Sequence, residues 1–184
     1  MASNHFEGKI LNVHPNLAVK INPVFYQLLN GSYEGWFYER FINLVSYEKQ
    51  GQHIVAFVDN NSNVYESRVK TIHVYGIDEL SPLEFVDFIQ KSISNDQFVN
   101  LWCDEYYIKD SIRYHEYHFV HPLTVYGVQD GRVYCEFFST TRGMTLIEVP
   151  MDDLRQAYYS IKDSYLCGAS YEILKVAMST YEVK

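Results

Sequence analysis

The sequence has few basic residues, few cysteines and no long apolar run, and each shortage excludes a class of protein. Lys and Arg number 15 against 23 Asp and Glu, which gives a formal net charge of −8 and an isoelectric point near 5.3. Most of the surface would therefore repel a phosphate backbone, and we expect no nucleic-acid partner. No stretch approaches the roughly 18 consecutive apolar residues that span a bilayer, so no membrane segment is expected.

The N-terminal region and the cysteines indicate a reducing compartment. Residues 1–20 lack the apolar run behind a basic start that marks a secretory leader. Cys103, Cys135 and Cys167 are an odd number, and without a leader they do not indicate a disulfide framework. We therefore expect reduced thiols in a cytoplasmic protein. The sequence also contains no P-loop, dinucleotide-type glycine motif or Gly-x-Ser-x-Gly elbow, and no cofactor is expected.

What the chain does contain is enough apolar material for one core and an excess of aromatic residues. Its 184 residues, 47% of them hydrophobic, predict a single globular domain over 1–184. Tyrosine and phenylalanine number 17 and 11. A tyrosine buries its ring while its hydroxyl stays wet, so these residues suit either half-exposed strands or a contact surface. Both interpretations stay open.

The apolar spacing predicts an α+β fold in three parts. These are a helical part at about 21–50, a sheet-rich part at about 52–150 with one inserted helix at 82–94, and C-terminal helices at 152–180. Within the sheet-rich part we expect a hairpin around an Asp59–Asn63 turn and strands at 69–75, 97–108 and 144–149.

Two local signals are specific enough to set boundaries. Ser81 can cap the inserted helix, with Pro82 at its first position and Glu84 three residues after the cap, as in a capping box. Asp130-Gly131 lies between β-branched and aromatic runs in 118–139, which predicts two strands joined by a type I′ turn.

His121 is the residue in this hairpin that could carry chemistry, because a strand holds an imidazole rigidly beside its neighbours. A regular two-residue turn would place Val125 opposite Glu136. On that register Glu136 shares a face with His121 and is its nearest orienting group. Cys135 would lie on the opposite face, which makes it a poor nucleophile.

The spacing of His115, His118 and His121 invites a metal interpretation. In a helix the outer two would diverge, and in a strand the middle one would face away from the others. Neither arrangement gives three convergent ligands, so no metal site is expected.

The run LWCDEYYIKDSIRYHEYHFVHPLTVYGVQDGRVYCEFF resembles the C-terminal half of papain-like cysteine peptidase and acyltransferase domains. The most similar are the bacteriocin-leader peptidase-like group and the N-terminal domain of the butirosin biosynthesis protein H family. The shared features are a strand ending in Asp104-Glu105-Tyr106, a loop, and a histidine strand that runs from His121 to an acidic turn at Asp130. The resemblance covers roughly residues 80–160 and implies a papain-like fold, with N-terminal helices packed on a mainly antiparallel sheet.

The resemblance also implies a cysteine nucleophile in the first turn of an N-terminal helix, where the helix end lowers the thiol pKa. The matching segment, NPVFYQLL from Asn22, contains no cysteine. Cys103 is the best substitute among the three thiols, because it precedes Asp104 on the strand that should neighbour the histidine strand.

The family implies a bacterial protein of specialised-metabolite or peptide biosynthesis. It would bind or process an acyl or peptidyl intermediate, with a carrier protein or another biosynthetic protein as partner. As an enzyme it would perform acyl-transfer, amide-forming or peptidase chemistry, with His121 as general base and Glu136 or Asp104 as orienting group. Cys103 or a bound water would then be the nucleophile.

Two further classes stay open. A protein that has lost its thiol would keep the pocket and use tyrosines such as Tyr106 and Tyr126 to hold a ligand. A non-catalytic interaction or immunity-type α+β protein would explain the acidic charge and the aromatic residues without any chemistry.

Overall fold

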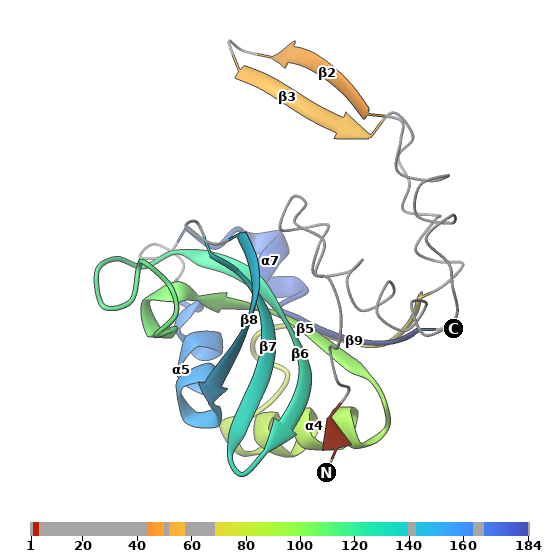
Figure 1. The fold of residues 1–184 in the computed structure, drawn as a ribbon. Helices are drawn as coiled ribbons and strands as arrows, with labels where there is room; N and C mark the ends of the chain where they lie inside the picture. The colour runs from red at the N-terminus through yellow and green to blue at the C-terminus, as the bar shows by residue number, and fades with distance from the viewer. Residues whose placement is uncertain are drawn as a thin grey trace.

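The computed structural model describes residues 2–3, 44–49, 52–57, 69–139, 143–163 and 168–183. They form one seven-stranded antiparallel sheet, a separate two-stranded hairpin and helices (Figure 1). The predicted α+β class is therefore confirmed. Within the described residues, no helix is both long enough and apolar enough to cross a membrane.

The main sheet has the strand order β4-β9-β5-β6-β7-β8, and the short β1 pairs with the end of β6. Its strands are β1 (Ala2–Ser3), β4 (Val69–Tyr75), β5 (Phe98–Asp104), β6 (Val120–Gln129), β7 (Arg132–Ser139), β8 (Gly143–Pro150) and β9 (Met178–Val183).

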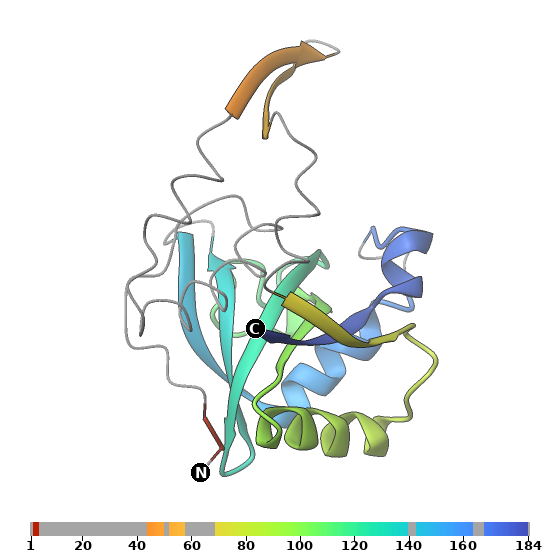
Figure 2. The same cartoon turned by 90° about the vertical axis from the view of Figure 1, so that its right-hand side faces the viewer.

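Two helices, α4 (Pro82–Ser94) and α5 (Met151–Ser160), pack beside each other against the sheet (Figure 2). The rings of Phe85 and Tyr158 stack between them with centroids 4.9 Å apart. Both rings are fully buried, and each removes enough apolar area from water to contribute about 2–3 kcal/mol. The remaining helical segments are η1 (Glu105–Tyr107) and the short α7 (Tyr171–Lys175).

The predicted hairpin turn is confirmed, but the predicted register beyond it is wrong. Asp130 and Gly131 have φ of 50° and 74°, as a type I′ turn requires, and Gln129 pairs with Arg132. A bulge between Val125 and Gly127 then shifts the pairing by one residue. Glu136 therefore lies opposite Thr124, and it is Cys135 that lies opposite Val125.

The prediction of helix over residues 170–180 is only half right. The helix ends at Lys175, and β9 follows as an inner strand that pairs with both β4 and β5. Met178 and Thr180 are buried, as a strand between two neighbours requires. Burial in the sheet outweighs the weak helical preference of this short segment.

The predicted N-terminal helical part lies mostly outside the described residues, and the helix expected from Asn22 lies wholly outside them. Where it is described it is wrong, since β2 (Leu44–Lys49) pairs with β3 (Gln52–Phe57) as an antiparallel hairpin. The predicted turn at Asp59–Asn63 also lies outside the described residues. The strand predicted at 69–75 is confirmed as β4.

The capping box predicted for α4 is confirmed. The Ser81 hydroxyl accepts the Glu84 N–H at 3.4 Å, and the Glu84 carboxylate accepts the Ser81 N–H at 2.8 Å. These hydrogen bonds lower the pKa of Glu84, so they stabilise the helix start while that carboxylate is ionised.

Replacing Ser81 with alanine should lower the free energy of unfolding by about 1 kcal/mol, because it leaves a backbone N–H of the first turn unpaired. Urea denaturation measures this change. Ser94→Ala is the matched control at the other end of α4, where the hydroxyl donates only to the Gln90 carbonyl. Equal losses in the two variants would contradict the capping role.

Candidate functional site

The candidate site is built around Asp104, the last residue of β5. Its side chain is 1% exposed, and its Oδ1 accepts the backbone N–H groups of Tyr106 and Phe119 at 3.1 and 3.0 Å. Its Oδ2 lies 2.6 Å from His118 Nδ1 and accepts the Ser160 hydroxyl at 3.3 Å. One buried carboxylate thus joins the start of η1, the beginning of β6 and the end of α5.

The next residue, Glu105, buries a second carboxylate and holds the loop that follows. Its side chain is also 1% exposed. Oε2 accepts the Ser111 hydroxyl at 2.5 Å and Arg113 Nη1 at 2.6 Å, and the Glu105 backbone N–H donates to the Phe119 carbonyl at 2.8 Å. Glu105 therefore holds the first half of the loop between η1 and β6 through its carboxylate, and the last residue of that loop through its backbone N–H.

His121 contacts the other oxygen of Glu105, with Nδ1 2.9 Å from Oε1. The distance suits an ion pair. Neither atom has a hydrogen-bond partner among the described residues, so the contact is a close approach and not a well-directed hydrogen bond. The ring lies edge-on to Phe119 and Phe138, with centroids 5.8 and 5.7 Å away. The imidazole is thus held between two aromatic rings and a buried carboxylate, with 16% of its side chain exposed.

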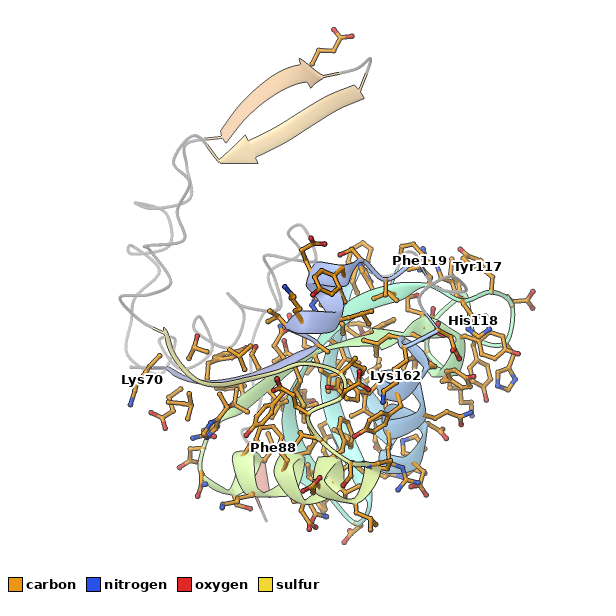
Figure 3. All side chains as sticks on the ribbon, turned by 180° about the vertical axis from the view of Figure 1, so that it is seen from behind. Lys70, Phe88, Tyr117, His118, Phe119 and Lys162 are labelled. Carbon is orange, nitrogen blue, oxygen red and sulfur yellow. The ribbon has the colours of Figure 1, made fainter. Side chains whose placement is uncertain are left out.

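His118 contacts the carboxylate of Asp104, as His121 contacts that of Glu105. Its ring stacks on Tyr106 at 4.3 Å with an interplanar angle of 19°, and its side chain is 28% exposed. Tyr117, His118 and Phe119 lie together at one end of the molecule, on the loop that precedes β6 (Figure 3). Two neighbouring acids on β5 and η1 therefore bind two histidines that are three residues apart.

The start of β6 explains why His121 can reach this loop. The recorded β6–β7 pairs begin at Thr124, so Pro122, which has no N–H to donate, lies beyond the paired part. On the other side Cys103 is the strand partner of His121. His121 thus sits where β6 is paired with β5 and is no longer paired with β7.

Cys103 lies beside the site, but its chemistry does not suit a nucleophile. The thiol is fully buried and lies 3.5 Å from the His121 carbonyl, to which it can donate, and it is not bonded to the imidazole. Burial, together with the charges of Glu105 and Asp104, raises the pKa of this thiol well above its usual value. Burial likewise raises the pKa of Cys135. Both thiols are therefore held protonated, whereas nucleophilic attack requires the thiolate.

The structure brings together some of the sequence-predicted site residues and separates others. Tyr106 lies at the site as the platform for His118. Tyr126 lies five residues after His121 on β6, about 16 Å away by strand rise. It forms a small cluster with Phe98 and Tyr181. Glu136 lies near that cluster. Burial is the main cause that raises the pKa of Tyr181, and the charge of Glu136 is the next.

The carboxylate that contacts His121 is therefore neither of the two predicted ones, Glu136 and Asp104. The bulge in β6 shifts Glu136 away, and Asp104 bonds His118 instead. The carboxylate at this position is that of Glu105, which the prediction of Glu136 or Asp104 did not include. The signal that could have found it is the acidic pair Asp104-Glu105 followed by two histidines three residues apart.

The electrostatics favour an ionised Glu105. Burial alone would raise the pKa of its carboxyl, but contacts with His121, Ser111 and Arg113 outweigh burial and hold the pKa below its usual value. Burial also opposes the charge on Arg113, yet Glu105 and Tyr117 outweigh it and raise the guanidinium pKa. The pair is therefore charged at neutral pH.

With Nδ1 next to Glu105, Nε2 is the His121 nitrogen left to exchange a proton with a ligand. A carboxylate at Nδ1 orients the ring and stabilises the imidazolium that forms when Nε2 takes a proton. The arrangement thus suits a general base. Within the described ranges, no group of three or more His, Cys, Asp or Glu side chains has the geometry to hold a metal ion.

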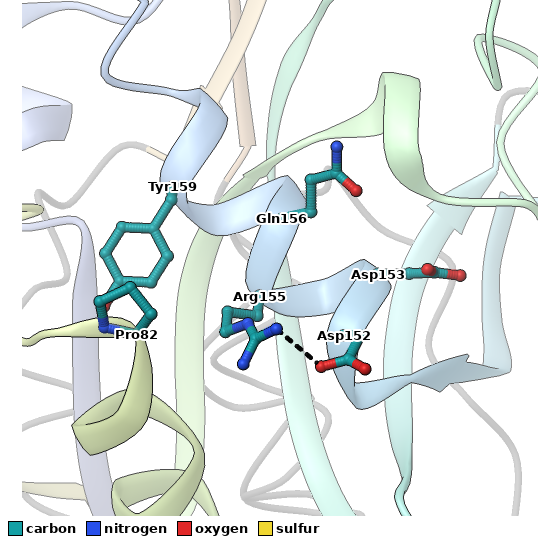
Figure 4. Close-up of a pocket in the computed structure, with 6 residues that line it drawn as sticks. All are labelled: Pro82, Asp152, Asp153, Arg155, Gln156 and Tyr159. Atoms are coloured by element: carbon teal, nitrogen blue, oxygen red, sulfur yellow. Dashed lines mark ion pairs between the residues drawn. The ribbon is translucent and has the colours of Figure 1, made fainter.

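A surface pocket lies along α5 and the first residue of α4, lined by Pro82, Asp152, Asp153, Arg155, Gln156 and Tyr159 (Figure 4). Arg155 Nη2 and Asp152 Oδ1 form an ion pair 2.9 Å long in it. None of the six residues belongs to the histidine–carboxylate pairs.

Comparison of the chain with models of known protein families finds no match, and comparison with curated proteins finds none either.

Replacing Arg113 with glutamine should lower the free energy of unfolding by about 2–4 kcal/mol near neutral pH, because a buried carboxylate loses its cation. The sign with pH follows from the lowered pKa of Glu105. A lowered pKa stabilises the folded state above the ordinary carboxyl pKa, and that stabilisation is lost as the pH falls through the folded pKa. The difference in free energy of unfolding between Arg113→Gln and the unaltered protein should therefore narrow below about pH 4. Denaturant unfolding at several pH values measures it.

Arg155→Gln is the control, because the ion-pair partner of Arg155 is Asp152, a surface residue that is 81% exposed. Surface pairs contribute little, so this variant should lose less than about 0.5 kcal/mol. A loss for Arg113→Gln no larger than that would show that the Glu105 network does not stabilise the fold.

Cys103 and Cys135 should resist alkylation by iodoacetamide in the folded protein and react once it is unfolded, because both thiols are buried and protonated. Mass spectrometry of the two cysteine peptides, before and after addition of urea, measures this. Fast labelling of Cys103 under native conditions would show that its thiol is reactive.

Proposed function

We propose that the protein is a papain-like fold member of a bacterial specialised-metabolite or peptide pathway, and that it processes an acyl or peptidyl intermediate held on a carrier protein. In this proposal His121 is the general base and Glu105 orients it. Tyr106 supports the neighbouring His118 and so shapes the wall of the site.

The observation that carries the proposal is the contact of His121 Nδ1 with the buried Glu105, at 2.9 Å. A histidine that served only as packing would not need a carboxylate held by two further residues. Arg113 and Ser111 fix that carboxylate from its other oxygen, so the imidazole orientation does not depend on a flexible side chain. The His121 side chain is also 16% exposed, so a ligand could reach the imidazole from solvent.

The order of the elements also supports the proposal. A strand ending in Asp104-Glu105-Tyr106, a loop and a histidine strand follow one another, and the first and third are paired neighbours in the sheet. This is the sequence of elements expected from the resemblance to papain-like domains.

The proposed reaction uses an external nucleophile, because Cys103 and Cys135 are buried and protonated. The nucleophile would be a water, a hydroxyl or an amine. His121 Nε2 would take its proton while the lone pair on the nucleophile's oxygen or nitrogen forms a bond to the acyl carbon. The bond from that carbon to the thiol leaving group breaks, and the proton passes from Nε2 to the departing sulfur. The imidazolium formed in between is stabilised by Glu105.

A second candidate is a binding protein without catalysis. It is favoured by the burial of Cys103 and Cys135, whose protonated thiols leave the described residues without a cysteine nucleophile. Such a protein would hold the same intermediate at the same loop and leave its bonds intact.

The two candidates are separated by turnover of S-acyl N-acetylcysteamine thioesters with water or an added amine. His121→Ala should lower the rate by about a hundredfold or more, since a positioned general base contributes about that much. Glu105→Gln should lower it less, because the ring remains but its orientation and charge compensation are lost.

His73→Ala is the matched control, because His73 is an exposed histidine of β4 that contacts only Tyr75 and Phe88 among the described rings. Its rate should equal that of the unaltered protein. A larger loss in His118→Ala than in His121→Ala would assign the base to His118. Absence of turnover in the unaltered protein would favour binding alone.

A further inference from the structure

The loop between η1 and β6 exposes an unusual concentration of large apolar side chains. Ile112, Tyr114, Tyr117 and Phe119 are 51, 36, 51 and 38% exposed within eight consecutive residues. We refer to these four residues as the loop patch. In the described part of the chain, the other exposed large apolar residues are scattered over β4, α4 and the region of α7: Val74, Leu83, Tyr171 and Val176.

Two of the three rings in the loop patch, Tyr117 and Phe119, are held in place by the network that holds the site. The Arg113 guanidinium lies 4.1 Å from the ring centroid of Phe119 and 5.5 Å from that of Tyr117, and its Nε donates to the Tyr117 hydroxyl at 2.9 Å. Arg113 is itself fixed by Glu105 at 2.6 Å. The exposed faces are therefore preformed.

Backbone hydrogen bonds add to this rigidity. The N–H of Tyr114 donates to the Ser111 carbonyl at 3.2 Å, and the N–H of His115 donates to the Tyr106 carbonyl at 3.0 Å. The N–H of Phe119 donates to Asp104. Binding here would cost the protein little conformational entropy. Rigid aromatic side chains also give a large contact area at a low entropic cost.

The charge of the loop differs from that of the whole chain. Lys109 and Arg113 balance Asp110 and Glu116, whereas the chain carries a net charge of −8. A neutral, apolar group would lose no ion pair by binding here and would gain contact with ring faces.

One member of the loop patch lies next to the candidate base. Phe119 belongs to the patch, and its ring is 5.8 Å from the ring of His121. A group seated on the patch would therefore place the atoms attached to it close to His121.

We propose that the loop patch is the subsite for an aromatic side chain of the acyl or peptidyl substrate, next to the carbonyl on which His121 acts. The inference rests on the proposed function for the identity of the ligand, and on exposure, rigidity and position for the subsite. It predicts a preference for phenylalanyl over glycyl or acidic substrates.

Binding can be tested without any reaction. N-acetyl-phenylalanine methylamide, N-acetyl-glycine methylamide and N-acetyl-aspartate methylamide are titrated into the full chain, and backbone amide shifts are followed by NMR. The phenylalanine compound should shift the amides of residues 112–119 and bind about fivefold or more tightly than the glycine compound, the ratio expected of one aromatic contact. Equal affinities for the phenylalanine and glycine compounds would overturn the proposal.

Variants then locate the binding. Ile112→Ser and Tyr114→Ser should each weaken binding of the phenylalanine compound about fivefold, because they remove apolar surface without removing a side-chain contact of Arg113. Leu83→Ser and Val74→Ser are the matched controls, at 78 and 48% exposure on α4 and β4, and should leave the affinity unchanged. Equal weakening in the control variants would overturn the proposal.

The subsite and the proposed function fail separately. If phenylalanyl and glycyl N-acetylcysteamine thioesters react equally fast and turnover needs His121, the subsite is wrong and the function stands. If the phenylalanine compound binds at residues 112–119 but His121→Ala leaves turnover unchanged, the subsite stands and the function is wrong.

Discussion

The end of β5 depends on the burial of two adjacent carboxylates, Asp104 and Glu105, in a protein that already carries excess negative charge. Each is 1% exposed, and ionised carboxylates at such sites are costly unless every oxygen is compensated. The chain supplies two histidines, one arginine, two serines and backbone N–H groups to these carboxylates, and Glu105 Oε1 has the close approach of His121 in place of a hydrogen bond. The same contacts order the loop, align His121 and present the loop patch. Stability and site geometry therefore share one set of interactions, and neither can be altered alone.

The elements that could be predicted from the sequence are those with strong local signals. The capping box at Ser81 and the Asp130-Gly131 turn act over three or four residues, so their outcome depends little on the rest of the chain. β9 could not be predicted in this way, because residues 178–183 become a strand only through β4 and β5, which are distant in sequence. The bulge in β6 did have a local signal, because an isolated glycine inside a strand often marks a bulge and Gly127 lies there, but the predicted register was regular.

The candidate site was predictable in its centre and not in its partners. His121 and the Asp104 strand end were identified from the residues and their spacing, and they do lie together. The orienting carboxylate was missed, because a one-residue change of register moved Glu136 to Thr124 and the neighbour of Asp104 took its place. Arg113 and Ser111 were missed for a different reason. They act through a loop whose path the sequence pattern does not encode, since polar residues in a loop have no periodicity from which to read a direction.

The position of β9 has a consequence for how the protein forms during synthesis. The strand lies between β4 and β5, yet it comes after every other strand of the sheet in the sequence. On the ribosome, β5 to β8 can pair as soon as they emerge, because each pairs with its successor in the chain. The edge of β5 must then wait, unpaired and rich in apolar residues, until residues 178–183 leave the exit tunnel. An open edge of this kind pairs readily with other chains, so the nascent protein passes through a stage in which chaperone binding and translation speed influence its yield.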